Sequence, residues 1–396
     1  MPDTSQPASA PAFLNLGFRP FFAGAIVLAC ITMLVWSGLS VFGWQWHQTA
    51  MPAVTWHAHE MIFGYGMAVI AGFLLTAVKN WTGIQTLSGI PLLALFLLWL
   101  CGRIALLAGT GVALELAAIA DCLFIALLVV ALAVPVVRVR QWRQMGILSK
   151  LFLLLLSNLL FYAGVLGLYP DGTRAGLYSG LYMIMALIFA MARRVLPFFI
   201  EKGIESPVAL INRAWLDMAS LVLLVMFWIA DILKPDTLPV AILAALLCLL
   251  HAMRLAGWYA AGLWHKPLLW VLYTGYGALV IGFALKAAVP VFGIAPYLPL
   301  HAFGYGGIGL FTVGMMARVT LGHTGRNVFE APAVLFWIFA ILGAGAVIRV
   351  VFPLADPRHY LLWIGLAQLF WIISFALLLV VLLPMLVKPR VDGQPG

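Results

Sequence analysis

The sequence predicts an all-α polytopic membrane protein of about 12 transmembrane helices, with both termini in the cytoplasm. Its 396 residues are 65% hydrophobic and 9% charged, with a mean hydropathy of +1.10. Soluble domains carry about 25% charged residues, so this composition excludes a soluble globular chain. The apolar residues also form separate runs near the length of roughly 20 residues that a spanning helix needs.

Twelve apolar runs are expected to cross the membrane, with boundaries placed to within about 2–4 residues. They are Arg19–Val41, Ala58–Val78, Ile90–Ala108, Ala113–Val137, Leu151–Leu168, Leu177–Leu196, Leu216–Leu233, Leu238–Trp258, Leu268–Val289, Leu298–Ala317, Ala333–Phe352 and Leu361–Leu386. A polar tail, residues 1–17, precedes this single transmembrane domain, residues 18–387, and a short tail, residues 388–396, follows it. Met1–Ala12 lacks the basic stretch of a signal peptide, so the first span is expected to be retained.

Basic residues gather on one side of these spans. That side holds Arg19, Lys79, Arg138, Arg140, Arg143, Lys150, Arg193, Arg194, Lys202, Arg213, Arg254, Lys266, Arg318, Arg326, Lys388 and Arg390. The other side holds only Arg174, Lys234, Lys286, Arg349 and Arg358. The positive-inside rule then predicts cytoplasmic termini and an even helix count. The formal net charge of +9 is explained by this orientation signal, and no motif indicates nucleic-acid binding.

Two helix entrances on the outer side carry side chains suited to a metal. The first is Trp56-His57-Ala58-His59-Glu60-Met61, followed by Phe63-Gly64-Tyr65-Gly66; the second is His301-Ala302, followed by Phe303-Gly304-Tyr305-Gly306. Polar side chains are costly in a membrane and usually mark function, which favours a heme site over histidines that merely reach the interface. The glycines either receive a flat macrocycle or allow close helix packing. Because the four cysteines include no CxxCH motif, the heme would be b-type and held without covalent links.

The two neighbouring histidines cannot both face one heme in a regular helix, because His57 and His59 diverge by about 200°. One of them would ligate the iron, while the other would serve a second metal or bond a loop. Copper is a candidate for that second metal, and the combination of His57, His47 and Met61 suits its preference for soft ligands. A methionine in an apolar helix is, however, ordinarily a packing residue.

Charged residues near these entrances have either a functional or a purely structural interpretation. Glu60 either orients an imidazole or is solvated at the interface. Arg103 is expected to form a structural pair with Glu115. Arg349 and Arg358 either contact heme propionates or are ordinary solvated loop cations.

Several motifs together resemble the NnrS family of bacterial membrane proteins. They are Phe18-Arg19-Pro20-Phe21-Phe22, the Trp56–Met61 cluster, Gly72–Val78 leading to Asn80-Trp81-Thr82-Gly83, Arg194–Phe199 and Leu321–Arg326. The resemblance covers nearly the whole chain. It implies a multi-pass protein of the bacterial inner membrane that binds heme and copper, is associated with the response to nitric oxide, and is made in denitrifying or nitrosatively stressed cells. Relatives often carry a histidine where this chain has Tyr162, which bears on any metal site there.

A more distant likeness is to the catalytic subunit of heme–copper oxidases and nitric oxide reductases. That subunit also has twelve helices, and it holds a low-spin heme between histidines of its second and tenth helices. By this analogy His59 and His301 are the favoured axial ligands, with His57 as the alternative ligand or the ligand of a second metal. This chain has no histidine in the sixth or seventh span, where that family binds copper.

Three classes of function remain open from the sequence. The first is a heme protein that senses nitric oxide or protects against nitrosative stress, with nitric oxide as its small-molecule ligand in the lipid bilayer. The second is an oxidoreductase of nitric oxide or O₂ that takes electrons from a quinol or a cytochrome. The third is a transporter or a metal- or heme-handling protein, for which matched breaks at the middle of the membrane would be expected.

Overall fold

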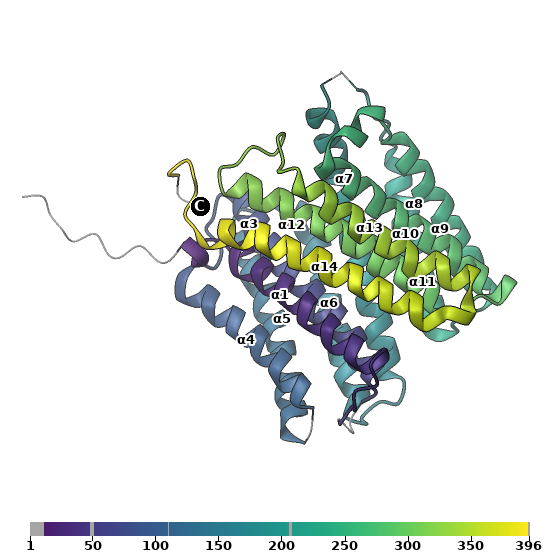
Figure 1. The fold of residues 1–396 in the computed structure, drawn as a ribbon. Helices are drawn as coiled ribbons and strands as arrows, with labels where there is room; N and C mark the ends of the chain where they lie inside the picture. The colour runs from purple at the N-terminus through teal and green to yellow at the C-terminus, as the bar shows by residue number, and fades with distance from the viewer. Residues whose placement is uncertain (1–11, 48–50, 110, 206–207, 395–396) are drawn as a thin grey trace, which may run out of the picture.

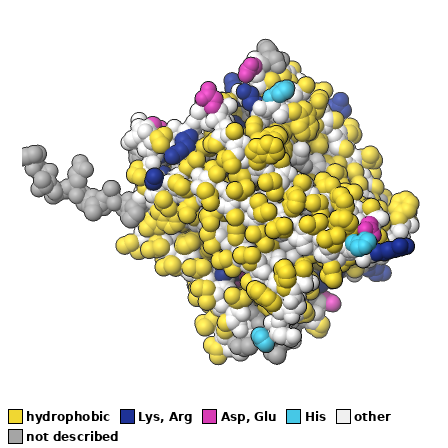
Figure 2. All heavy atoms as spheres, viewed as in Figure 1, with side chains coloured by type: hydrophobic (Ala, Val, Ile, Leu, Met, Phe, Trp, Pro, Cys, Tyr) yellow, Lys and Arg dark blue, Asp and Glu magenta, His cyan; other side chains and the backbone are white. Residues whose placement is uncertain are grey.

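A computed structural model describes residues 12–47, 51–109, 111–205 and 208–394, and in these residues all regular structure is helical. Within these described residues, twelve helices are long and apolar enough to cross a membrane (Figure 1). The predicted fold class, an all-α multi-pass membrane protein, is therefore confirmed. Apolar side chains cover the middle of the molecular face in Figure 2, and charged side chains lie toward its edges, as expected of a lipid-facing surface.

The spans follow one another with short connections. They are α1 (Phe18–Ser40), α2–η2–α3 (Ala53–Thr82), α4 (Gly89–Ala108), α5 (Val112–Arg138), η3–α6 (Trp142–Val165), α7 (Gly172–Gly203), α8 (Ala214–Leu233), α9 (Leu238–Gly257), α10 (Pro267–Phe292), α11–η5–α12 (Tyr297–His323), α13 (Val334–Ala355) and η6–α14 (Pro357–Val387). The third and fourth spans are separate helices. Gly109 ends α4 with a φ of 58°, a left-handed conformation that glycine adopts without strain.

Several predicted spans differ from the helices that form, and α6 and α7 are two of them. The run predicted as Leu151–Leu168 ends early, because Val165 closes α6 and Gly167 turns the chain with a φ of 75°. The run predicted as Leu177–Leu196 is longer, since α7 continues to Gly203. Its added C-terminal turns bury Pro197, Ile200 and Gly203, and Arg193, just before them, donates from Nε to the Asp217 carboxylate at 2.9 Å.

The second and tenth spans form the centre of the bundle together with α7. Of the most apolar 18-residue window, 83% is buried in Ala53–Thr82 and in Tyr297–His323, and 67% in α7. The corresponding share is 33% in α4, α9 and the η6–α14 span. The three central spans therefore contact protein on most sides, while the others present apolar side chains to lipid.

Both chain ends lie at the same end of the bundle, here called the terminal face (Figure 1). Arg19, near the start of α1, joins them directly: its Nη1 donates to the carbonyl oxygens of Leu386 at 2.8 Å and Lys388 at 2.7 Å. These carbonyls belong to the end of α14, where a helix leaves its last acceptors unpaired. Because the first span begins at the terminal face, every even-numbered span begins at the opposite end of the bundle. The histidine-bearing entrances of the second and tenth spans therefore lie at that end, here called the histidine face.

Each central entrance contains a π-helical segment. In the first, α2 (Ala53–His59) passes into η2 (Glu60–Gly66) and then α3 (Met67–Thr82). In the second, α11 (Tyr297–His301) passes into η5 (Ala302–Gly309) and then α12 (Leu310–His323). Both Phe-Gly-Tyr-Gly motifs fall inside these segments. Such π-helical turns are rare and are found frequently at functional sites.

Candidate functional site

A cavity of about 260 Å³ opens between the two central entrances and α7 at the histidine face. This histidine cavity is lined by Met33, Val54, His57, Ala58, Met61, Ile62, Tyr65, Leu177, Tyr178, Leu181, Ile184, Tyr297, Leu300, His301, Gly304, Tyr305, Ile308 and Trp371. Most of these side chains are apolar or aromatic, and two imidazoles are the nitrogen donors among them. That composition is typical of a pocket for a small molecule, which usually measures roughly 300–1,000 Å³.

Equivalent residues of the two entrances form opposite walls of the histidine cavity. They are His57, Met61 and Tyr65 in the first entrance, and Tyr297, His301 and Tyr305 in the second. Within each set the members are four residues apart, a spacing that keeps side chains on one helix face. When the Phe-Gly-Tyr-Gly motifs are aligned, Tyr297 takes the position of His57, and His301 takes the position of Met61.

The hydrogen bonds of His301 fix the state of its ring. Nδ1 lies 2.8 Å from the Tyr297 carbonyl oxygen, which can only accept, so Nδ1 carries the proton. Nε2 is then the nitrogen with the free electron pair, and it accepts from Nη2 of Arg349 at 3.1 Å. A histidine held by Nδ1 to a backbone carbonyl, with Nε2 directed at the site, is the usual arrangement for a metal ligand.

Arg349 of α13 is a buried cation that forms no ion pair with a carboxylate of the described residues. It is 7% exposed, and its guanidinium lies over the rings of Tyr297 at 5.3 Å and Tyr360 at 5.8 Å. Its Nη1 has no hydrogen-bond partner among the described residues. A buried charge is stable only when it is paired, so this arginine is suited to an anionic group of a bound ligand.

His57 and Gly304 complete the geometry of the cavity. The His57 ring stacks on Trp36, with centroids 4.7 Å apart and planes at 8°, and its Nδ1 lacks a hydrogen-bond partner in the described part of the chain. At Gly304 a Cβ atom would meet nothing within 4 Å. The wall opposite His57 is therefore open at this glycine.

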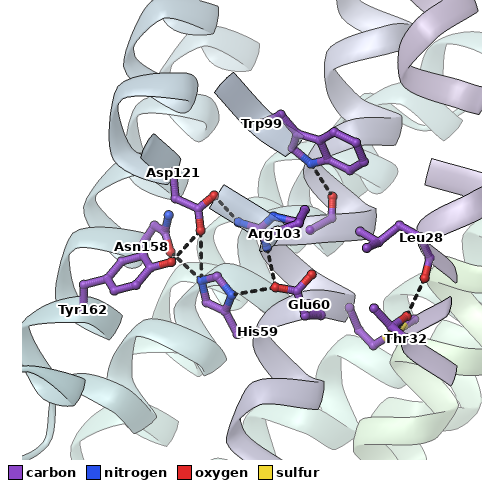
Figure 3. Close-up of polar contacts among 11 residues, drawn as sticks. Leu28, Thr32, His59, Glu60, Trp99, Arg103, Asp121, Asn158 and Tyr162 are labelled. Carbon is purple, nitrogen blue, oxygen red and sulfur yellow. Dashed lines mark hydrogen bonds and ion pairs between the residues drawn. The ribbon is translucent and has the colours of Figure 1, made fainter. Parts of the chain in front are cut away.

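His59 does not line the cavity. It is fully buried on the other side of the first entrance, where Nε2 lies 3.0 Å from Oδ1 of Asn158 in α6 (Figure 3). Each ring nitrogen also faces a carboxylate, with Nδ1 3.8 Å from Glu60 and Nε2 3.7 Å from Asp121. His59 is thus part of a polar network rather than a wall of the histidine cavity.

That network, the Arg103 cluster, consists of Arg103, Glu60, Asp121, His59, Asn158 and Tyr162. Arg103 of α4 donates to Oε1 of Glu60 at 2.7 Å and also to Oδ1 of Asp121 in α5. Tyr162 donates to Oδ2 of Asp121 at 2.6 Å. The predicted pair of Arg103 with Glu115 is wrong, because two buried carboxylates already surround the guanidinium.

The structure brings His57 and His301 to one cavity and leaves His59 on the far side of the first entrance. The angular separation of about 200° between His57 and His59 accounts for this, since one of them must turn away. Aligning the two motifs on the sequence would have given the same choice, because His57, Met61 and Tyr65 correspond to the set that contains His301. The depth of the histidines alone did not distinguish them.

The remaining expected ligands are dispersed. His47 is exposed in the loop after α1, while Met61 lines the cavity beside His57. Arg358 is exposed at the start of the last span. In the described residues no three His, Cys, Asp or Glu side chains are grouped closely enough to hold a metal ion.

Comparison with known proteins agrees with the sequence motifs. The NnrS family model, described as NnrS protein, matches residues 12–390. No curated protein matches the chain at a significant level. The match covers all twelve spans and both histidine entrances, and the chain therefore belongs to the NnrS family.

Proposed function

We propose that this protein binds a b-type heme in the histidine cavity and serves in the response to nitric oxide and resistance to nitrosative stress. The observation that carries the proposal is the meeting of His57 and His301 on opposite walls of one cavity. His57 and His301 would hold the iron, in place of the His59–His301 pair favoured by analogy. His59 is already surrounded by groups of the Arg103 cluster.

Three features of the cavity support a heme in particular. The Nδ1 proton of His301 is bound to a carbonyl, which leaves Nε2 as the donor atom. Arg349 lacks an anion, and a propionate would supply one as the guanidinium leaves Nε2. Gly304 leaves open space where any larger side chain would project. A flat macrocycle with carboxylates at one edge matches this combination.

The residues of the cavity also determine what reaches it. Its aromatic and aliphatic walls exclude charged species, because a charge that enters must lose its hydration. An uncharged gas dissolves in the membrane and has no such barrier. Ferrous heme, when bound, would supply an iron that combines with nitric oxide once one of the two imidazoles releases it, and the chain would hold and shield it.

Copper is the other metal that the family implies, and its site is a separate proposal. His57 with Met61 offers an imidazole and a thioether on one helix face, which suits Cu(I). Only two protein donors are present there. We therefore treat copper as an alternative occupant of His57, with heme as the first proposal.

The location that we propose is the bacterial inner membrane, with the terminal face in the cytoplasm. The support is the excess of Lys and Arg at that face, including Arg19, Lys79 and Arg390. The histidine cavity would then lie near the periplasmic side of the bilayer.

The test is the visible spectrum of detergent-purified protein, oxidised, reduced with dithionite, and reduced with nitric oxide. His57→Ala and His301→Ala are each expected to lose most of the reduced α band. His59→Ala keeps it if the protein still folds, and His359→Ala is the matched control, since His359 is an exposed histidine on the same face.

Two outcomes would contradict the proposal. One is wild-type protein without heme after growth with abundant iron and porphyrin precursor. The other is an unchanged reduced spectrum in both His57→Ala and His301→Ala. Loss of the band in His59→Ala alone, with normal thermal unfolding, would favour His59 as the ligand.

A further inference from the structure

We propose that three cavities in series form an apolar passage by which small uncharged molecules move between the terminal face and the histidine cavity. Beneath the histidine cavity, a middle cavity of about 60 Å³ lies between α1, α3, α7 and α12. A terminal-face cavity of about 180 Å³ follows between α3, α7 and α12, where Asn80, Trp81 and His323 line its outer part. The three cavities together extend from one face of the bundle to the other.

Neighbouring cavities share lining residues. Ile184 of α7 lines both the histidine cavity and the middle cavity. Phe73, Met191 and Met315 line both the middle cavity and the terminal-face cavity. Methionine is unbranched and adapts its shape readily, so Met191 and Met315 are the adaptable part of the boundary between the second pair.

The boundary between the histidine cavity and the middle cavity, here called the upper junction, has a glycine where a larger side chain would clash. A Cβ atom on Gly66 would lie 2.7 Å from Cδ1 of Ile184, so the glycine makes the room that Ile184 occupies. At the same level, the Tyr65 hydroxyl lies 2.6 Å from the Thr312 hydroxyl. Tyr65 lines the histidine cavity and Thr312 lines the middle cavity. One isoleucine and one hydroxyl pair therefore separate the two.

The chemistry of the middle cavity selects what can pass. Its lining is apolar except for Thr312, whose hydroxyl is already engaged with Tyr65 and with the Ile308 carbonyl at 2.6 Å. An ion or a hydrated molecule would find no hydrogen-bond partner there and would lose its hydration. Apolar cavities of this kind stay dry and accept small apolar guests. The passage therefore suits an uncharged molecule the size of a diatomic gas.

The proposed function enters only as the destination of this passage, because the cavities exist whether or not heme is bound. A heme-free experiment can therefore decide the passage. Thiols placed in its wall report access directly. The four native cysteines, Cys30, Cys101, Cys122 and Cys248, are first replaced by alanine.

Two isoleucines of equal burial provide the matched pair. Ile184 is 2% exposed and lies in the passage, while Ile125 of α5 is 1% exposed and lines none of the three cavities. Ile184→Cys and Ile125→Cys are treated with uncharged methyl methanethiolsulfonate and with its sulfonatoethyl analogue, and modification is followed by mass spectrometry. We expect the uncharged reagent to modify Ile184→Cys several-fold faster than Ile125→Cys. The anionic reagent should modify the two variants at similar rates.

A blocking variant tests whether the terminal-face cavity is the route. Val319→Trp fills that cavity, and Val347→Trp, at a lipid-facing position that is 50% exposed, is its control. Val319→Trp is expected to slow modification of Ile184→Cys several-fold, and Val347→Trp to leave it unchanged. Equal rates for the two cysteines, or no effect of Val319→Trp, would overturn the passage.

Carbon monoxide links the passage to the proposed heme. In heme-loaded protein, Val319→Trp should slow recombination of CO after flash photolysis while leaving the absorption spectrum unchanged. An unchanged recombination rate would overturn the passage as a route to the heme. If the protein holds no heme, the proposed function fails, and the cysteine experiment still decides the passage on its own.

Discussion

The two helix entrances share a motif and a backbone form, yet they differ in what lies behind them. In the first, a Cβ atom on Gly64 would lie 2.7 Å from Oε2 of Glu60 and 3.1 Å from Nη1 of Arg103. In the second, the equivalent Gly304 opens on the histidine cavity and would meet nothing within 4 Å. The equivalent glycines thus contact an ion cluster in the first entrance and open space in the second.

The difference shows that neighbouring helices, rather than the motif, assign each side chain its role. The first entrance has two functional faces, with His57 toward the cavity and His59 toward the Arg103 cluster. The second has one, because Phe303 behind it packs on the Phe283 ring at 5.0 Å. The buried ion cluster therefore lies behind the first entrance, and the cavity is shared by both.

The largest loss of stability is expected when the cation behind the first entrance is removed. Arg103→Met leaves Glu60 and Asp121 buried without their guanidinium, and loss of one member of such a pair typically costs about 3–5 kcal/mol. The midpoint of thermal unfolding in detergent should fall accordingly. Arg358→Met, at an exposed arginine, is the control, and an equally small shift in both variants would show that the cluster contributes little to stability.

The next largest difference in stability is expected between alanine variants of the two equivalent glycines, Gly64 and Gly304. Gly64→Ala forces Glu60, Arg103 or Leu28 to move, and overpacking of this kind typically costs about 1–3 kcal/mol. Gly304→Ala has room for its methyl group and should keep or raise stability, since alanine favours helix over glycine by about 1 kcal/mol. Its expected defect is lower heme content, because the methyl group enters the cavity. Equal thermal shifts in the two variants would contradict the assigned difference.

The smallest effect is expected where the two entrances are most alike. Tyr65→Phe loses the bond to Thr312 at 2.6 Å, and Tyr305→Phe loses the bond to the Ala367 carbonyl at 2.9 Å. Each loss should lower stability by about 1 kcal/mol, measured by thermal unfolding in the same detergent. A much larger loss in Tyr65→Phe would indicate that its hydroxyl pair holds the junction above the middle cavity closed.

The sequence by itself determined the spans and their depth. Long apolar runs must satisfy their backbone groups within a helix, so the predicted Ile90–Ala108 and Ala113–Val137 appear as α4 and α5 with ends shifted by only one residue. Helix ends that extend past the apolar run were missed where the further turns still bury side chains. The end of α7 is one such case, because Ile200 and Gly203 are buried beyond the predicted end at Leu196.

Only the tertiary structure decided what surrounds the histidine that turns away from the cavity. His57 and His59 have the same residue type and nearly the same depth, and helix geometry states only that they point apart. The surroundings of His59 depend on Asp121 of α5 and Asn158 of α6, which contact its ring, and on Arg103 of α4, which pairs with Asp121. Their separation along the chain leaves no local signal, because a buried polar group takes its partner from whichever helix packs against it.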